Sequence, residues 1–317
     1  MYRKNCTEEA IQIISVVLVR PDGYRYEIDQ AIKTGGGAMR IGFVGAGKVG
    51  CSLGKYFATK GASVSGYYSR TLASAKVAAE FVGTNYYESL ETVVDESDCL
   101  FFTVNDAAIE DVWNKVKEMN ISGKIICHCS GAKSASVFEG INERGAFGFS
   151  LHPISPFSSK YESYKNVEDA YFTLEGENIA LSEMKEFLEE MGLSYSLLSG
   201  DNKVKYHGAC VFASNLAIGL FDDATKLLCD VGFTKEDAKR ALKPLILQNI
   251  TAFLEKDAKD ALTGPVERGD VATVEAHLSV LDKNQKEVYR SLSKELLGIA
   301  KEKHKEKDYG NMESLLG

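Results

Sequence analysis

The chain has 317 residues, of which 44% are hydrophobic, so it can bury a large core and is long enough for two domains. Its formal net charge of -8 argues against nucleic acid as a general partner, because phosphate binding requires a basic face. No apolar stretch approaches the ~20 residues that span a bilayer, and the seven cysteines are scattered without the spacing of a disulfide framework. We therefore expect a cytoplasmic protein with reduced thiols, no membrane segment and no nucleic-acid partner.

Residues 1–38 form an extension that precedes the first recognisable motif. An apolar run from Ile11 to Val19, the turn Pro21-Asp22-Gly23 and an alternating run from Tyr24 to Ile28 make a β-hairpin possible. Gly35-Gly36-Gly37-Ala38 then indicates a flexible joint. This extension is either an edge hairpin or an upstream appendage.

A glycine-rich turn follows the strand Arg40 to Val44 and opens the expected helix Lys48 to Lys60. Gly45 permits the tight turn, Gly47 lets the backbone approach a pyrophosphate, and Gly50 allows close packing of helix on strand. The first N–H groups of the helix, at Lys48 and Val49, then point at the anion. This order of strand, turn and helix predicts a Rossmann domain that binds a dinucleotide.

The second strand, Ser63 to Tyr68, ends at Ser69-Arg70-Thr71. An NAD enzyme usually carries an acidic residue here for the ribose 2′-hydroxyl, whereas two hydroxyls and a guanidinium suit a 2′-phosphate. This difference favours NADP as the cofactor. The alternative is a helix N-cap at Ser69 or Thr71 beside a solvated arginine.

Three further strands are expected at 99–104, 124–129 and 147–151, with helices at 72–81 and 107–119 between strands. Ligands bind at the carboxyl ends of parallel strands, which places Val104, Asn105, Ser130 and Gly131 near the cofactor. Asp106 can instead cap the next helix, and His152 is either a substrate neighbour or a capping residue. Cys127-His128-Cys129 fits a buried strand better than a metal site.

Strands at 167–174 and 193–198, with a helix at 179–191, extend the sheet, and from Ser199 onward the pattern is helical. We therefore divide the chain into the extension 1–38, a Rossmann domain 39–198 and a helical substrate or dimerisation domain 199–317. Helices are expected at 203–231, 234–256, 270–281 and 285–302. Pro244 should kink or split the second of these helices, and residues 301–308 indicate a solvated helix end.

The opening of the long helix carries the polar groups that could act on a substrate. Lys203, His207 and Ser214 lie near one line of the helix, with Asn215 to the side. A histidine can supply the proton that a carbonyl reduction needs, so His207 is our proposed general acid. The alternatives are a buried structural histidine, with Lys203 or Lys205 as the acid.

A second group of polar residues lies in the stretch Leu262 to Asp270. Asp270 is a good helix N-cap, and Gly264-Pro265 is a good turn. Arg268 is not explained in that way. It could clamp a substrate carboxylate through a two-pronged hydrogen bond, or it could form a surface ion pair.

The order of these motifs, ending in Leu262-Thr263-Gly264-Pro265 and Arg268-Gly269-Asp270, resembles a bacterial family that joins a Rossmann-like NADP-binding domain to an uncharacterised helical C-terminal domain. That family is similar to the superfamily of 6-phosphogluconate dehydrogenase and pyrroline-5-carboxylate reductase, and some members look like an alternative ketopantoate reductase. In the related hydroxyacid dehydrogenases a helix lysine acts as the acid. The matching position here holds His207, and Val211 stands where those enzymes carry Asn.

The resemblance and the residues together predict an NADP-dependent reductase of a small carboxylated carbonyl compound, with 2-dehydropantoate as the best match. His207 would donate the proton, Ser214 and Asn215 would hydrogen-bond the substrate, and Arg268 would orient its carboxylate. An imine reductase of the pyrroline-5-carboxylate reductase type and a non-catalytic NADP-sensing protein are the alternatives. We also expect a homodimer.

Overall fold

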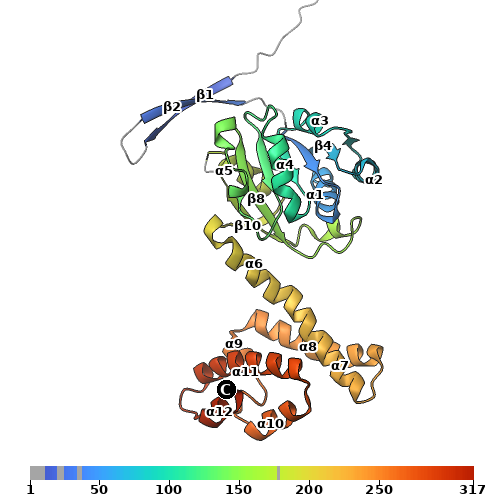
Figure 1. The fold of residues 1–317 in the computed structure, drawn as a ribbon, viewed down its shortest axis with the longest axis vertical. Coiled ribbons are helices and arrows are strands. Elements are labelled where there is room, and N and C mark those ends of the chain that lie inside the picture. The colour runs from blue at the N-terminus through green and yellow to red at the C-terminus, as the bar shows by residue number, and fades with distance from the viewer. Residues whose placement is uncertain (1–10, 20–24, 34–37, 177–178) are drawn as a thin grey trace, which may run out of the picture. The chain divides into compact units, whose positions relative to one another are not determined.

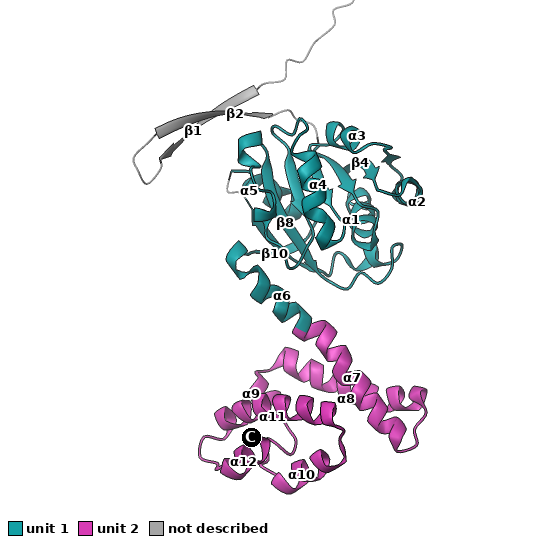
Figure 2. Cartoon of the chain, viewed as in Figure 1, with its two compact units in different colours: residues 1–211 teal, residues 212–317 magenta. Residues whose placement is uncertain are grey.

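The computed structural model describes residues 11–19, 25–33, 38–176 and 179–317. The chain divides into two units, Met1–Val211 and Phe212–Gly317 (Figure 2). The predicted turn at 21–23 and the glycine joint at 35–37 lie outside the described residues. Strands β1 (Ile11–Val19) and β2 (Arg25–Lys33) pair antiparallel in a sheet of their own, as the hairpin prediction expected.

The described part of the first unit contains an eight-stranded sheet in the order β10-β9-β8-β7-β6-β3-β4-β5 (Figure 1). Its strands are β3 (Arg40–Val44), β4 (Ser63–Tyr68), β5 (Asn85–Tyr86), β6 (Cys99–Phe102), β7 (Ile125–His128), β8 (Phe147–Ile154), β9 (Tyr171–Gly176) and β10 (Ser194–Leu197). Strands β3 to β8 run parallel to one another. This arrangement confirms the predicted Rossmann architecture.

Strands β9 and β10 depart from a wholly parallel sheet, because β9 pairs antiparallel with β8 while β10 is parallel to β9. Between β8 and β9 the chain forms only a short 3-10 turn, Ser163–Asn166. A parallel pairing usually requires a crossover helix at this point. The return of the chain without such a helix therefore reverses the last two strands.

Consecutive strand residues point to opposite sides of the sheet, and here both sides are apolar. Helices therefore cover both faces. Phe43 and Phe101 belong to one buried cluster with α1 (Lys48–Thr59), α2 (Leu72–Val82) and α5 (Leu181–Glu190). Val44 and Phe102 belong to a second buried cluster with α3 (Leu90–Asp95) and α4 (Ile109–Val116). The short helix α3 is an element that the sequence prediction did not include.

The second unit is helical, and its first part continues from α6 (Lys203–Val211) of the first unit through the π-helical segment Phe212–Leu216. The further helices are α7 (Ala217–Asp230), α8 (Lys235–Glu255), α9 (Ala258–Ala261), α10 (Val271–Val280), α11 (Lys283–Lys303) and α12 (Gly310–Leu316). The boundary between the two units thus falls between Val211 and Phe212, whereas the sequence pattern changes at Ser199. Pro244 lies inside α8 without splitting it.

Residues 301–308 hold the end of α11 and a mostly exposed connection, as the sequence indicated, but a helix that was not predicted follows them. Helix α11 ends at Lys303, and the chain then turns into α12. Tyr309, Met312 and Leu316 are buried in a cluster with residues of α10 and α11. The charged residues before Tyr309 therefore form a connection to a packed C-terminal helix. Among the described residues, no helix is both long and apolar enough to cross a membrane.

Candidate functional site

The carboxyl ends of the parallel strands β3 to β8 meet at one edge of the sheet, where ligands bind in folds of this kind. The turn after β3 follows the glycine prediction closely. Gly45 has a φ of 116°, and a Cβ at this position would lie 2.8 Å from the carbonyl oxygen of Thr103. At Gly50 a Cβ would lie 2.4 Å from the Thr103 hydroxyl. Only glycine fits at these two positions.

Helix α1 begins after Gly47 with no side-chain cap and no acidic residue in its first turn. A Cβ at Gly47 would meet only the Thr103 carbonyl oxygen, at 3.7 Å, so the space beside this residue is open. The first N–H groups of a helix carry a partial positive charge and favour an anion. The segment with Lys48 and Val49 is therefore a suitable anion-binding terminus.

The segment after β4 leaves the side chains of its polar residues available. Thr71 occupies the N-cap position of α2, but its hydroxyl makes no capping hydrogen bond. Arg70 is exposed and forms no hydrogen bond or ion pair with the described residues. The capping role that competed with ligand binding is thus not realised at Thr71.

The loop after β6 packs directly against the glycine turn. The Thr103 hydroxyl donates to the Gly45 carbonyl at 2.9 Å, and the backbone nitrogen of Val104 lies 3.0 Å from the Cβ position of Gly45. The capping residue here is Asn105, whose Oδ1 accepts the N–H of Ala108 at 3.0 Å. The predicted cap at Asp106 is therefore wrong by one residue, because Asp106 already lies inside the 3-10 turn.

The turn after β7 is held in place by two side chains. The Ser130 hydroxyl accepts backbone N–H groups from Ala132 and Lys133, at 3.2 and 3.0 Å. His128 is fully buried, accepts the Ser130 N–H at Nδ1 and lies 3.1 Å from the Ser134 carbonyl at Nε2. Burial lowers the pKa of His128 to about 4, so the ring is neutral and Nε2 carries the proton. The described residues contain no group of three or more side chains that could hold a metal ion.

Two imidazoles lie over Gly131 in this turn. A Cβ at Gly131 would be 2.6 Å from His207 Nδ1 and 2.8 Å from His152 Nε2. The Nδ1 of His152 is 2.6 Å from the hydroxyl of Tyr206, which precedes His207 in α6. His207 Nδ1 is buried and has no hydrogen-bond partner. The structure therefore brings Gly131 and His207 together, and adds His152 and Tyr206.

Lys203 lies in the interior below this group of side chains, with only 1% of its surface exposed. Its ammonium donates to the Ser150 hydroxyl at 2.7 Å. Burial lowers the pKa of Lys203. Burial, followed by the charge of Lys203, lowers the pKa of His152 to about 4. The lysine considered as an alternative acid is thus buried, and its charge adds to the effect of burial in lowering the pKa of His152.

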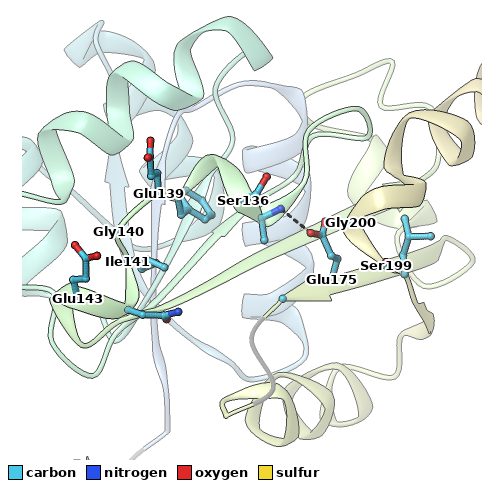
Figure 3. Close-up of a pocket in the computed structure, with 13 residues that line it drawn as sticks. Ser136, Glu139, Gly140, Ile141, Glu143, Glu175, Ser199 and Gly200 are labelled. Atoms are coloured by element: carbon cyan, nitrogen blue, oxygen red, sulfur yellow. Dashed lines mark hydrogen bonds between the residues drawn. The ribbon is translucent and has the colours of Figure 1, made fainter. Parts of the chain in front are cut away.

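A cavity of about 540 Å³ lies in the first unit, and the sequence did not indicate it (Figure 3). Residues 135–143, the end of β9 and the segment before α6 line it. Glu175 joins two of the lining segments, because its Oε1 accepts the N–H of Ala135 at 3.0 Å. Its Oε2 is buried without a hydrogen-bond partner among the described residues. Burial raises the pKa of Glu175. Glu175 lies opposite Ser150 in the β8–β9 pair, next to the hydroxyl that binds Lys203.

The other predicted substrate residues belong to the second unit. Ser214 and Asn215 lie in the exposed π-helical segment, and the Ser214 hydroxyl donates to Asn215 Oδ1 at 3.0 Å. Arg268 is exposed and forms no ion pair with the described residues, so the surface ion pair considered for it is not realised. Asp270 caps α10 as predicted, by accepting the Thr273 N–H at 3.1 Å. The roles of Ser214, Asn215 and Arg268 at a substrate stay predictions.

Comparison with known families agrees with this architecture. Residues 28–153 match the model of the Rossmann-like domain, and residues 170–296 match a domain of unknown function, DUF2520. The chain joins a Rossmann-like domain to a DUF2520 domain. The predicted combination of a Rossmann-like domain with an uncharacterised C-terminal domain is thereby confirmed.

Solved structures share the fold of this Rossmann-like/DUF2520 chain. A candidate NADP oxidoreductase from Bacteroides fragilis, BF3122, is 23% identical with a TM-score of 0.67, over 82% of this chain and 98% of that one. A pyrroline-5-carboxylate reductase from Coxiella burnetii is 15% identical with a TM-score of 0.56, over 84% of this chain and 98% of that one. These likenesses show that the chain shares its fold with these proteins.

One curated relative matches a smaller part of this chain than these structures do. The glutamyl-tRNA reductase of Caldivirga maquilingensis is 26% identical over 212 residues, which are 66% of this chain. The chain spans about 44% of the length of that relative.

Proposed function

We propose that this protein is an NADP-dependent oxidoreductase that reduces a small carboxylated carbonyl compound, with 2-dehydropantoate as the first substrate to test. The observation that carries the proposal is the pair of imidazoles over Gly131, on the same edge of the sheet as the uncapped glycine turn. Such an edge combines a dinucleotide site with groups that can hold and protonate an oxygen atom.

The residues of the first unit fit NADP. Gly45, Gly47 and the first turn of α1 with Lys48 and Val49 would hold the pyrophosphate. Ser69, Arg70 and Thr71 would bind the 2′-phosphate, since the guanidinium is exposed and the Thr71 hydroxyl is not used as a cap. Val104, Asn105, Ser130 and Gly131 would line the rest of the site. The oxidoreductase from Bacteroides fragilis, named for NADP, supports the same choice.

When bound, NADPH supplies the hydride for the reduction. His207 would protonate the oxygen of the carbonyl group as negative charge develops on it, a task for which a histidine near neutral pH is suited. Ser214 and Asn215 would hydrogen-bond the substrate, and Arg268 would bind its carboxylate with two parallel hydrogen bonds. Because Arg268 has no ion-pair partner among the described residues, its guanidinium is available for this contact.

Arg70→Ala tests the cofactor assignment. We expect the ratio of NAD Kd to NADP Kd to fall at least tenfold in this variant, mostly through weaker NADP binding. Lys76→Ala is the matched control, because Lys76 is an exposed cation on α2 that lies over the Tyr86 ring, 4.9 Å from its centroid. An unchanged ratio in Arg70→Ala would refute the assignment.

The substrate is tested by rescue of a pantothenate auxotroph that lacks its reductase and by NADPH oxidation with 2-dehydropantoate. Imine reduction is the second candidate, supported by the structural likeness to pyrroline-5-carboxylate reductase. Turnover of pyrroline-5-carboxylate but not of 2-dehydropantoate would favour it. Tight NADPH binding without turnover of either compound would indicate a non-catalytic NADP-sensing protein.

We further propose a homodimer through the second unit. Helices α7 and α8 span 14 and 21 residues, yet each contributes one buried residue, Thr225 and Ala238. Large apolar side chains remain exposed on both helices, including Ile218, Phe253 and Leu254. Helices of this length gain most of their stability from packing an apolar face, which a second copy would provide. Analytical ultracentrifugation should show that the wild type is a dimer and that Phe253→Asp weakens the dimer. Val280→Asp on α10 is the control and should leave the dimer intact. A monomeric wild type would refute the proposal.

A further inference from the structure

Two imidazole nitrogens lie close together over Gly131. His207 Nδ1 and His152 Nε2 lie 2.6 and 2.8 Å from a single point, the Cβ position of Gly131, so their separation is at most the sum of these distances. When one oxygen atom makes hydrogen bonds of normal length to two nitrogens, the two nitrogens lie roughly 5.6 Å apart at most. The two nitrogens are therefore close enough to each other for one oxygen atom to hydrogen-bond to both.

Both nitrogens lack a partner within the described part of the chain. His207 Nδ1 is buried without a hydrogen bond, and His152 Nε2 makes none. Buried polar atoms in folded proteins are nearly always paired with protein or water. An unpaired buried nitrogen that faces a second unpaired nitrogen across a glycine indicates that a further polar atom belongs between them.

Tyr206 determines which nitrogen of His152 carries the proton. The 2.6 Å distance from the Tyr206 hydroxyl to His152 Nδ1 suits an O–H donor better than a ring N–H donor, whose hydrogen bonds are usually longer. Burial raises the pKa of Tyr206 to about 12, so the phenol keeps its proton. With Nδ1 acting as the acceptor, the proton of the neutral imidazole resides on Nε2. Tyr206 thus leaves Nε2, the His152 nitrogen beside Gly131, as a hydrogen-bond donor.

The charges around His152 favour its neutral form. Burial and the Lys203 ammonium lower its pKa to about 4, well below the pH at which a cell works. The charged and titratable groups that act on His152 are Lys203, His207, Asp106 and His128, and Asp106 is the one that favours protonation. Lys203 is fixed in its buried position by the Ser150 hydroxyl on the same strand as His152.

We propose that His152 and His207 together bind the carbonyl oxygen of the substrate, with His152 as a hydrogen-bond donor through Nε2 and His207 as the proton donor through Nδ1. Tyr206 is a positioning residue that fixes the His152 tautomer. This inference rests on the proposed reductase function. As NADPH is oxidised and its hydride forms the new C–H bond, the π electron pair of the carbonyl moves to oxygen. The oxygen takes the proton from His207, which is reprotonated by solvent, while His152 keeps its own proton.

The tautomer is measured by ¹⁵N NMR of the imidazole rings in the cofactor-free chain, which has five histidines. His128 is an internal reference, because its bonds to Ser130 N–H and the Ser134 carbonyl place its proton on Nε2. We expect His152 to show the same protonated Nε2, and Tyr206→Phe to give a mixture of tautomers. Tyr289→Phe is the matched control, since Tyr289 pairs with His277 Nδ1 at 2.9 Å in the second unit and should leave the His152 signals unchanged. A proton on Nδ1 of His152 in the wild type would overturn the inference.

Kinetics separate this inference from the proposed function. We expect His152→Ala to lower kcat by about 10² or more, the usual effect of removing one donor to a developing oxyanion. His152→Gln carries an amide donor near the position of Nε2 and should recover part of that loss. Tyr206→Phe should lower kcat with KM little changed and alter the pH profile of kcat. A wild type without turnover of any carbonyl substrate refutes the reductase, whereas an active wild type with a fully active His152→Ala refutes only the two-imidazole site.

Discussion

The buried histidine of β7 makes the stability of the first unit depend on pH. Burial lowers the pKa of His128 from 6.5 to about 4. Between these values the unfolded chain binds a proton that the folded chain does not bind, so acid favours unfolding. At about 1.4 kcal/mol per pH unit, the loss attributable to His128 reaches about 3 kcal/mol. This stability is fully present above pH 6.5 and is lost as the pH falls towards 4.

The perturbation is His128→Asn, which keeps an acceptor for the Ser130 N–H but does not titrate. The assay is urea unfolding followed by tryptophan fluorescence. The ring centroid of the single tryptophan, Trp113, lies 5.3 Å from that of Phe138, which in turn lies 5.4 Å from that of His128. The variant should be less stable at pH 7.5, through the lost bond to Ser134, yet lose less stability on acidification to pH 5 than the wild type. His152, whose pKa is also about 4, keeps its contribution in both chains.

Ile126→Val is the matched control, since Ile126 is fully buried on the same strand and carries no titratable group. It should lower the free energy of unfolding by about 1 kcal/mol at every pH and leave the slope unchanged. If His128→Asn has the same slope against pH as the wild type, His128 does not stay neutral in the folded protein, and the reasoning is refuted.

Three further substitutions test other parts of the structure. Gly45→Ala forces a side chain into a left-handed turn 2.8 Å from the Thr103 carbonyl. Thermal unfolding should therefore show that the free energy of unfolding falls by more than about 1 kcal/mol, and titration with NADPH should show weaker binding. Unchanged NADPH affinity would contradict the proposed site. Burial raises the pKa of Asp98, but hydrogen bonds from Arg40 outweigh it and hold the pKa below its usual range. Asp98→Asn should therefore cost about 1 kcal/mol at pH 7, a deficit that shrinks as the pH falls below about 4 and is checked by unfolding at both pH values. Pro244→Ala restores a backbone donor inside exposed helix α8 and should raise the free energy of unfolding by up to about 3 kcal/mol in denaturant titrations, and a loss would show that α8 needs the proline.

Features that depend on neighbouring residues could be predicted from the sequence. Strand β4 begins and ends at the predicted residues, Ser63 and Tyr68, and Asp270 caps α10 because its carboxylate reaches an N–H only three residues away. The glycine turn is equally local, since the strain at Gly45 and the start of α1 lie within a few residues. Helix α3 could have been found in the same way, because Ser89 caps it by accepting the Thr92 N–H at 3.1 Å.

Features that depend on distant residues could not be predicted in this way. Lys203 looks like a solvent-exposed acid on a helix until Ser150, 53 residues earlier, binds its ammonium in the interior. The bond between His152 and Tyr206 joins residues 54 apart, and the reversal of β9 depends on a connection with no crossover helix. Periodicity places such side chains on a face but does not reveal what lies opposite them. The predicted line of Lys203 and His207 on α6 was therefore useful without identifying which of them faces Gly131.

The most direct test of the account is NADPH oxidation with 2-dehydropantoate by the wild type and by His207→Ala, together with the Kd for NADPH of each chain. The account predicts turnover by the wild type, a loss of about 10² or more in kcat for His207→Ala, and an unchanged Kd for NADPH. A variant that binds NADPH normally and loses less than about tenfold in kcat would contradict the assignment of His207 as the proton donor.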